Sequence, residues 1–354
     1  MGVKWDEAPR SVVWEITLLC NLHCHHCASG GGRARGYEMS TAEALDLCDQ
    51  FARLGVQSVC LFGGEAILRP DWTTLAERLR EQDIEVNTVT NGWAMTEKLA
   101  EKMIGLGFSD IGLSLDAAEA EKHDRIRGRK GAFERALRTL DLIDALPLPS
   151  KTLLTSVTRL NVDELAAIAE LVASRITDPE PWMWMINVAS CHDPERFGAE
   201  HVLDRKGYVE LCRTINDLRT RYEGRLDLTG AHDIGYYSMR FPNLHNFSWQ
   251  GCQAGLNTVG IHADGRVKGC LILPDAFVEG NVLEEPLEKI WLDPDRFALN
   301  RKFDRRALTG TCADCPYGHV CRGGCSDLAH SLTGSPYDFP YCLYRWEMEE
   351  LERG

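Results

Sequence analysis

Long apolar segments are absent from this sequence. No stretch of about 18 consecutive apolar residues occurs, so a membrane-spanning helix is not expected. The first ten residues are charged and contain no apolar stretch of the kind that a signal peptide needs. Internal repeats and low-complexity tracts are also missing, which excludes a repeat architecture. These absences predict a cytoplasmic globular protein.

Positive charge is scarce as well. Lys and Arg number 39 against 53 Asp and Glu, which gives a net charge of −14 at pH 7. A surface this acidic repels phosphate backbones and anionic lipids, so we expect neither nucleic acid nor membrane as a partner. The 354 residues, 44% of them hydrophobic, suffice for one large α/β domain and a smaller one.

Cysteine, in contrast, is abundant, with 14 residues. Because no secretion signal precedes them, thiolates that bind metal are expected rather than disulfides. Three lie near residue 20 and seven lie after residue 251. The other four stand singly: Cys48, Cys60, Cys191 and Cys212. The two groups therefore predict two metal-binding regions.

The first two thirds of the chain alternate between strand-like and helix-like stretches. Strands are expected at 12–17, 57–62, 84–90, 110–115, 152–158 and 182–188, and helices at 41–54, 71–82, 95–106, 131–145, 161–175 and 204–222. Asn161 and Glu164 are expected to form the cap of the fifth of these helices. Six strand–helix units predict a parallel sheet with right-handed crossovers, an open, partial (β/α)6 barrel of the α/β class.

The pattern changes beyond about residue 235, where Gly, Pro and Cys become frequent. We therefore expect an N-terminal arm over 1–10, the barrel over 11–235, a connector over 236–250 and a small metal-stapled domain over 251–354.

Polar and cysteine residues follow the predicted strands. In parallel sheets, ligands bind at the carboxyl ends of the strands. The residues at these positions are Cys20 after the first strand, Gly63, Gly64 and Glu65 after the second, Asn91 after the third, Ser114 and Asp116 at the fourth and Cys191 after the sixth. The sequence therefore predicts one site at this rim.

Cys20, Cys24 and Cys27 form a CxxxCxxC motif. Three thiolates on one tight loop can hold three irons of a [4Fe–4S] cubane and leave the fourth iron open. Zinc is the alternative, but a zinc site normally has four protein ligands, and the fourth would have to be a neighbouring histidine.

This motif, directly after the first strand of a partial barrel, resembles the radical S-adenosylmethionine (SAM) superfamily. The resemblance implies that SAM chelates the open iron and is cleaved to a 5′-deoxyadenosyl radical, which abstracts hydrogen from a substrate C–H bond. It also implies a one-electron reductase, such as flavodoxin or ferredoxin, as a partner.

The resemblance extends to individual SAM-binding residues. His26 would lie near the adenine, and Gly63-Gly64-Glu65 would bind the methionine amino group. Ser114 and Asp116 would lie near the ribose, and Arg127 would engage the SAM carboxylate, although a surface ion pair is the alternative for Arg127. Asn91, at the same rim, is expected to join this site.

The C-terminal cysteines resemble the SPASM extension of radical SAM enzymes, which carries two auxiliary [4Fe–4S] clusters. The resemblance implies that auxiliary cluster II takes Cys312, Cys315, Cys321 and Cys342, and that auxiliary cluster I takes Cys252, Cys270 and Cys325. The latter set is one cysteine short, so its fourth iron is either open or bound by another residue. Two ribbon-like zinc sites are the alternative.

Two residues are candidates for catalysis. Cys191 could donate a hydrogen atom to a substrate radical, or it could be a buried small residue. Asp233 could act as a general base that removes a proton from a product radical, or it could be a loop hydrogen-bonding residue.

Three functions are consistent with these patterns. The first is a maturase that crosslinks, oxidises, cleaves or epimerises a ribosomally made peptide. Only 19 residues precede Cys20, so we expect leader recognition to use a separate small protein or to be absent. The second is a dehydrogenase or epimerase of a small molecule such as a carbohydrate. The third is a non-enzymatic iron–sulfur protein for electron transfer or sensing.

Overall fold

The computed structural model describes residues 4–353 except 179, 181, 191, 194, 246 and 247. Its sheet begins with seven strands: β1 (Ser11–Thr17), β2 (Ser58–Gly63), β3 (Glu85–Thr90), β4 (Asp110–Ser114), β5 (Ser150–Val157), β6 (Trp182–Val188) and β7 (Leu226–Gly230). Neighbouring strands pair in parallel from β1 to β7. The predicted open α/β barrel is confirmed, and β7 adds one strand to the six expected.

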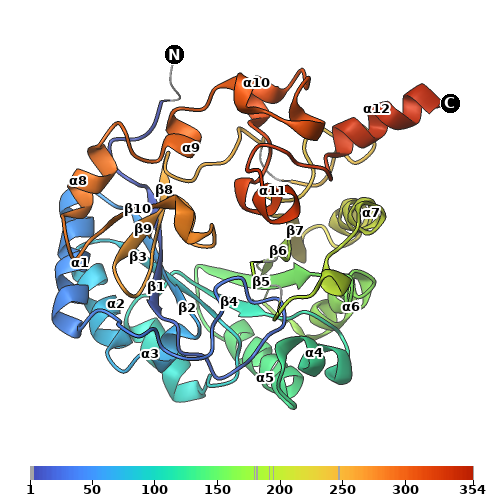
Figure 1. Cartoon of the computed structure of the whole chain (residues 1–354). Helices are drawn as coiled ribbons and strands as arrows, with labels where there is room; N and C mark the ends of the chain where they lie inside the picture. The colour runs from blue at the N-terminus through green and yellow to red at the C-terminus, as the bar shows by residue number, and fades with distance from the viewer. Residues whose placement is uncertain are drawn as a thin grey trace.

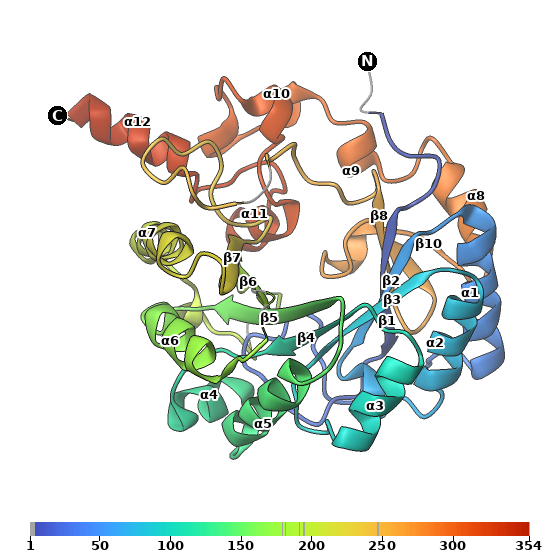
Figure 2. The ribbon, with the colours of Figure 1, turned by 180° about the vertical axis from the view of Figure 1, so that it is seen from behind.

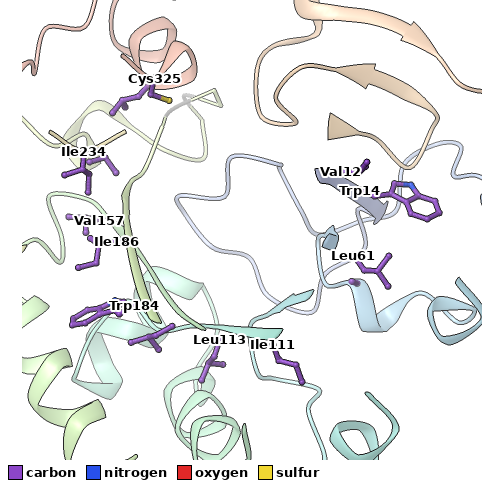
Figure 3. Close-up of a cluster of buried hydrophobic side chains, with 14 of the residues drawn as sticks. Val12, Trp14, Leu61, Ile111, Leu113, Val157, Trp184, Ile186, Ile234 and Cys325 are labelled. Atoms are coloured by element: carbon purple, nitrogen blue, oxygen red, sulfur yellow. The ribbon is translucent and has the colours of Figure 1, made fainter. Parts of the chain in front are cut away.

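Helices lie along the outer face of this curved sheet (Figures 1 and 2). They are α1 (Thr41–Leu54), α2 (Trp72–Glu81), α3 (Glu97–Gly105), α4 (Ala120–Arg127), α5 (Ala132–Asp144), α6 (Leu165–Arg175) and α7 (Arg205–Arg221). The helix α1 starts at a capping box, in which Ser40 accepts from the Glu43 amide while Glu43 accepts from the Ser40 amide. The side chains between sheet and helices form the hydrophobic core, and Trp14, Leu61, Leu113 and Trp184 point outward into it (Figure 3).

The inner face of the sheet differs from the outer one. Along β6, Trp182, Trp184 and Ile186 are buried, whereas Met183 and Met185 between them are only half-buried. The same alternation occurs in β3 and at the end of β5. Because successive side chains of a strand point to opposite faces, the half-buried residues line the concave side of the barrel.

The C-terminal region continues the same sheet. Its strands are β8 (Thr258–Ile261), β9 (Arg266–Lys268) and β10 (Val278–Asn281), and its helices are α8 (Leu287–Leu292), α9 (Ala298–Arg301), α10 (Gly318–Cys321), α11 (Ser326–Thr333) and α12 (Leu343–Arg353). The strand β8 pairs in parallel with β1, which makes one ten-stranded sheet in the order β10-β9-β8-β1-β2-β3-β4-β5-β6-β7. The region then passes over the open side of the barrel toward α7 (Figure 1).

A buried polar network joins the two regions. The Glu15 carboxylate on β1 is fully buried and pairs with Arg35 through Nε at 2.5 Å and Nη2 at 2.9 Å. His262, which follows β8, lies 3.3 Å from the same carboxylate. These partners lower the pKa of Glu15 to about 2 despite its burial, so the carboxylate stays charged at neutral pH.

The predicted cap at Asn161 is wrong. The helix α6 begins after Glu164, which makes no side-chain cap. The Asn161 side chain instead donates to the backbone oxygen of Asp116 and accepts from the Thr158 amide. It fixes the loop after β5 against the end of β4.

Candidate functional site

The three cysteines of the CxxxCxxC motif lie on the loop that follows β1. Each sulfur accepts a hydrogen bond: Cys20 from the Leu22 amide at 3.5 Å, Cys24 from Arg127 Nη1 at 3.9 Å and Cys27 from the Gly31 amide at 3.3 Å. None of the thirteen described cysteines is in a disulfide. Three sulfurs on one loop, each with a donor, fit thiolate ligands of an iron–sulfur cluster.

Without a bound cation, burial and the repulsion between neighbouring thiolates favour the neutral thiol form of these cysteines. Burial, the largest cause, together with Glu65, Cys24 and Cys27 raises the pKa of Cys20 to about 11, although the hydrogen bond from the Leu22 amide lowers it. The pKa of Cys24 is also raised by burial, although Arg127 lowers it. A cluster of positively charged irons would stabilise all three thiolates, so the donor set fits such a group.

The glycines after β2 allow a close approach of two loops. A side-chain carbon at Gly64 would lie 2.4 Å from the backbone oxygens of Leu18 and Leu19, and one at Gly63 would lie 2.0 Å from that of Thr17. No side chain fits at either position. The loop after β2 thus packs directly on the start of the cysteine loop.

Glu65 is buried beside this contact. Its carboxylate accepts from Thr90 Oγ1 at 2.7 Å and from the Asn91 amide at 2.9 Å. Asn91 Nδ2 in turn donates to Cys20 Sγ at 3.6 Å and Asn21 Oδ1 at 2.9 Å. Burial raises the pKa of Glu65 to about 7, against these hydrogen bonds. The structure therefore brings Glu65 and Asn91 to the first cysteine.

A second polar group lies on the other side of the loop. The fully buried Asp116 carboxylate is 2.7 Å from Arg127 Nε and 3.3 Å from His26 Nε2, and it also accepts from the Ser156 amide. Burial lowers the pKa of His26 to about 4, so the ring is neutral at pH 7. Its Nδ1 is buried without a hydrogen-bond partner among the described residues. Such an orphaned ring nitrogen fits a bound ligand.

Ser114 and Asp116 differ in burial and in their interactions with neighbouring side chains. Ser114, at the end of β4, is half-buried. The Asp116 carboxylate is fully buried and is already engaged by Arg127 and His26. Arg127 is buried too, not the surface ion pair considered as its alternative.

Arg196 also contacts the cysteine loop, a contact that no sequence motif predicted. Its guanidinium donates to the backbone oxygens of Cys24 at 2.7 Å and Gly31 at 2.9 Å. It follows β6, so it reaches the loop from the far edge of the barrel opening. A lone arginine outside any motif carries no signal in a single sequence.

The C-terminal cysteines form two groups. Cys312, Cys315, Cys321 and Cys342 line one small cavity with Tyr236 and Phe339. Burial, with smaller contributions from Asp327 and Cys252, raises the pKa of Cys270 to about 12. Burial also raises the pKa of Cys325, and Asp327 and Cys252 again contribute. Asp327 is thus the acidic neighbour of the three-cysteine group, and its Oδ1 lies 2.7 Å from His192 Nε2.

Asp233 lies between the barrel and this second group. Its Oδ2 accepts from the Val188 amide at 2.7 Å, whereas its Oδ1 is buried with no hydrogen-bond partner among the described residues. Burial raises its pKa to about 6, and Asp327 contributes in the same direction. Cys191 lies outside the described residues.

The fold and the site are those of an α/β protein whose cysteine loop, at the rim of an open barrel, is suited to an iron–sulfur cluster. The sequence matches the radical SAM superfamily over residues 14–172 and an iron–sulfur cluster-binding domain, SPASM, over residues 252–316. Mycofactocin maturase MftC from Mycolicibacterium smegmatis is 32% identical over 98% of this chain and 86% of that protein. The chain belongs to the radical SAM superfamily and carries a C-terminal SPASM domain.

Other proteins similar to this chain bear on what its substrate is. AdoMet-dependent heme synthase from Methanosarcina barkeri is 29% identical over 97% of this chain and 99% of that protein. The fold is shared with Streptococcus suis SuiB bound to precursor peptide SuiA, with a TM-score of 0.75 and 18% identity over 96% of this chain and 76% of that one. It is also shared with anSMEcpe with bound AdoMet, with a TM-score of 0.72 and 17% identity over 97% of both chains.

The predicted class of protein is confirmed by these matches: the chain is an enzyme that uses SAM and iron–sulfur clusters. The zinc alternatives are not supported. Within the described part of the chain, no helix combines the length and apolar character that crossing a membrane requires.

Proposed function

We propose that the protein is a cytoplasmic radical SAM maturase that abstracts hydrogen from a ribosomally made peptide. The observation that carries this proposal is the likeness to mycofactocin maturase MftC over nearly the whole chain. The concave face of the barrel supports it. Its half-buried residues include Phe62, Val89, Leu154, Met183 and Met185, an apolar surface suited to a peptide side chain.

A small-molecule substrate is the second candidate, favoured by the full-length match to AdoMet-dependent heme synthase. A tetrapyrrole carries carboxylates, which proteins commonly bind with Lys or Arg. Among the half-buried residues of the described strands β1 to β7, none is Lys or Arg. Without Lys or Arg among these residues, the concave face is better suited to a peptide substrate than to a tetrapyrrole with carboxylates.

We assign the SAM site to the residues around the cysteine loop. Cys20, Cys24 and Cys27 hold the cluster, which when reduced supplies the electron that cleaves SAM. Glu65 and Asn91 bind the amino group, and His26 contacts the adenine through Nδ1. Ser114 is the better partner for a ribose hydroxyl, since Asp116 is engaged in positioning Arg127 and His26.

Two further clusters complete the cofactor set, for a total of three. Cys312, Cys315, Cys321 and Cys342 hold one; Cys252, Cys270 and Cys325 hold the other. Residues 11–235 and 251–354 act as the radical-generating and auxiliary units, joined by the connector 236–250.

Asp233 serves as the general base. Its Oδ1 is buried and has no hydrogen-bond partner within the described part of the chain, and its pKa of about 6 leaves the carboxyl group ionised at pH 7 yet basic enough to accept a proton. A proton released by the substrate would move to this oxygen. Cys191 stays a candidate hydrogen donor. A reductase such as flavodoxin or ferredoxin supplies the electron.

The decisive experiment is anaerobic reconstitution followed by reaction with SAM, dithionite and candidate peptides. We expect about twelve irons per chain, 5′-deoxyadenosine as a product and a mass change in the peptide. Absence of 5′-deoxyadenosine in fully loaded protein would favour the non-enzymatic alternative. Product formed only with a small molecule would favour the second candidate.

A further inference from the structure

One short stretch next to the cysteine loop carries a local excess of positive charge in this acidic chain. Residues 125–138 contain five arginines and one lysine against a single acid, Glu134, although the chain as a whole carries −14. Arg127 is buried against Asp116, whereas Arg125, Arg129, Lys130, Arg135 and Arg138 are exposed. Only Arg138 is near an acid of the stretch, at 3.9 Å from Glu134.

This stretch borders the cysteine loop. The backbone oxygens of Ile126 and Arg127 accept from the amides of His25 and His23, and Arg129 donates to the Asn21 oxygen at 2.5 Å. Gly128 lines a hollow in the surface together with Cys20 and the exposed Arg33. The hollow at the first cysteine of the motif therefore lies next to the basic stretch, with Arg33 on its lining.

We name these exposed basic residues beside the cysteine loop the basic collar: Arg33, Arg125, Arg129, Lys130 and Arg135. Two of them lie over a half-buried aromatic ring. The guanidinium carbons of Arg129 and Arg135 lie 3.6 Å and 5.6 Å from the centroid of the Trp93 ring. Trp93 packs in turn against the small cluster of Leu22, Cys24 and Ala132 under the loop. The collar thus combines charge with an apolar centre that touches the cysteine loop.

We propose that the basic collar is the docking surface for an acidic one-electron reductase protein. This inference rests on the proposed function, because a reductase is needed only if the cluster must be reduced. One electron passes from the reductase, which is oxidised by one electron, to the cluster, which is reduced by one. Opposite charges speed such encounters and orient them, and weak electron-transfer complexes need only a small contact.

An acidic peptide substrate is the other partner that a basic surface could attract. The position of the collar favours the reductase, since it lies beside the cysteine loop on the surface lined by Cys20, whereas the substrate must reach the concave face of the barrel. An acidic peptide whose affinity depended on the collar would overturn the proposal.

The test compares two charge-reversed variants of the full, cluster-loaded chain. In R125E/K130E both side chains are exposed collar residues outside the SAM site. The matched control K206E/R221E makes the same charge change on the exposed side of α7. Binding of oxidised flavodoxin is measured by calorimetry at low and high salt. Formation of 5′-deoxyadenosine is then measured with reduced flavodoxin and, separately, with dithionite.

We expect R125E/K130E to weaken flavodoxin binding at least tenfold at low salt and to lower the flavodoxin-driven kcat/KM by a similar factor, with the difference shrinking at high salt. The dithionite-driven rate and the control variant should change less than twofold. Unchanged flavodoxin binding, or an equal loss in both variants, would overturn the docking site. Failure of wild-type protein with dithionite would instead refute the proposed function.

Discussion

At the scale of single residues, Glu65 shows how burial prepares a group for a charged ligand. Burial raises its pKa to about 7, so in the free protein the carboxyl group is about half protonated at pH 7. Only the carboxylate pairs with an ammonium group. We therefore expect the SAM affinity to fall about tenfold for each pH unit below 7 and to level off above it, measured by equilibrium dialysis.

The E65Q variant is the control for this pH dependence. It should bind SAM about 10- to 100-fold more weakly at pH 8, as expected for the loss of a charge-assisted hydrogen bond, and its affinity should not vary with pH. A wild-type affinity that is flat from pH 6 to 8, or that rises on acidification, would contradict the assigned role.

A second residue-scale prediction concerns Asp233. Its raised pKa of about 6 means that the base form is lost on acidification. With dithionite as reductant, peptide modification should decline below about pH 6, while 5′-deoxyadenosine formation should persist. The D233N variant should modify peptide at least a hundredfold more slowly at every pH, measured by mass spectrometry. Equal pH profiles for the two products would remove Asp233 from the mechanism.

Residue contacts also mark the limit of what the sequence could predict. The motifs identified Asp116 and Arg127 as site residues but did not predict that they pair. Ten residues of loop and helix lie between them, and the pairing depends on how α4 folds back. The helix cap predicted at Asn161 was wrong for the same reason. The local sequence pattern indicated a helix start, but the Asn161 side chain instead forms a tertiary hydrogen bond with the Asp116 backbone oxygen.

At the scale of elements, the loop after β2 depends on two glycines. In G64A the added methyl group would lie 2.4 Å from two backbone oxygens, and neither the Leu18 nor the Leu19 carbonyl can move without displacing the cysteine loop. We expect a loss of more than about 2 kcal/mol in stability and a loss of iron from the first cluster site, measured by iron analysis and thermal unfolding. G36A is the control, because nothing lies within 4 Å of its added carbon.

The strands of the barrel could be predicted from the sequence because each is a buried β-branched run followed by a helical pattern. The strands β7 to β10 could not. They are three to five residues long, and β8 to β10 lie in a Gly-, Pro- and Cys-rich region without periodicity. Their pairing depends on an edge that exists only after β1 and β6 have formed.

At the scale of the whole molecule, the barrel and the C-terminal region form one sheet. Removing residues 251–354 would strip β8 from β1, expose the β1 edge and leave Glu15 without His262. We expect a chain ending at residue 250 to aggregate, because an unpaired central strand recruits other chains. Full-length protein should unfold in one transition by circular dichroism and tryptophan fluorescence. A soluble, monomeric 1–250 fragment would contradict this prediction.

The pairing of β8 with β1 has a further consequence for electron movement. Cys20 follows β1, while Cys252 and Cys270 flank the β8–β9 hairpin, so a hydrogen-bonded ladder fixes how far apart these sulfurs lie. The rate of electron tunnelling falls exponentially with distance. A flexible hinge between the two cysteine sites would make this rate fluctuate. If these cysteines hold two clusters as proposed, the distance an electron must cross between them is set by strand register rather than by a hinge.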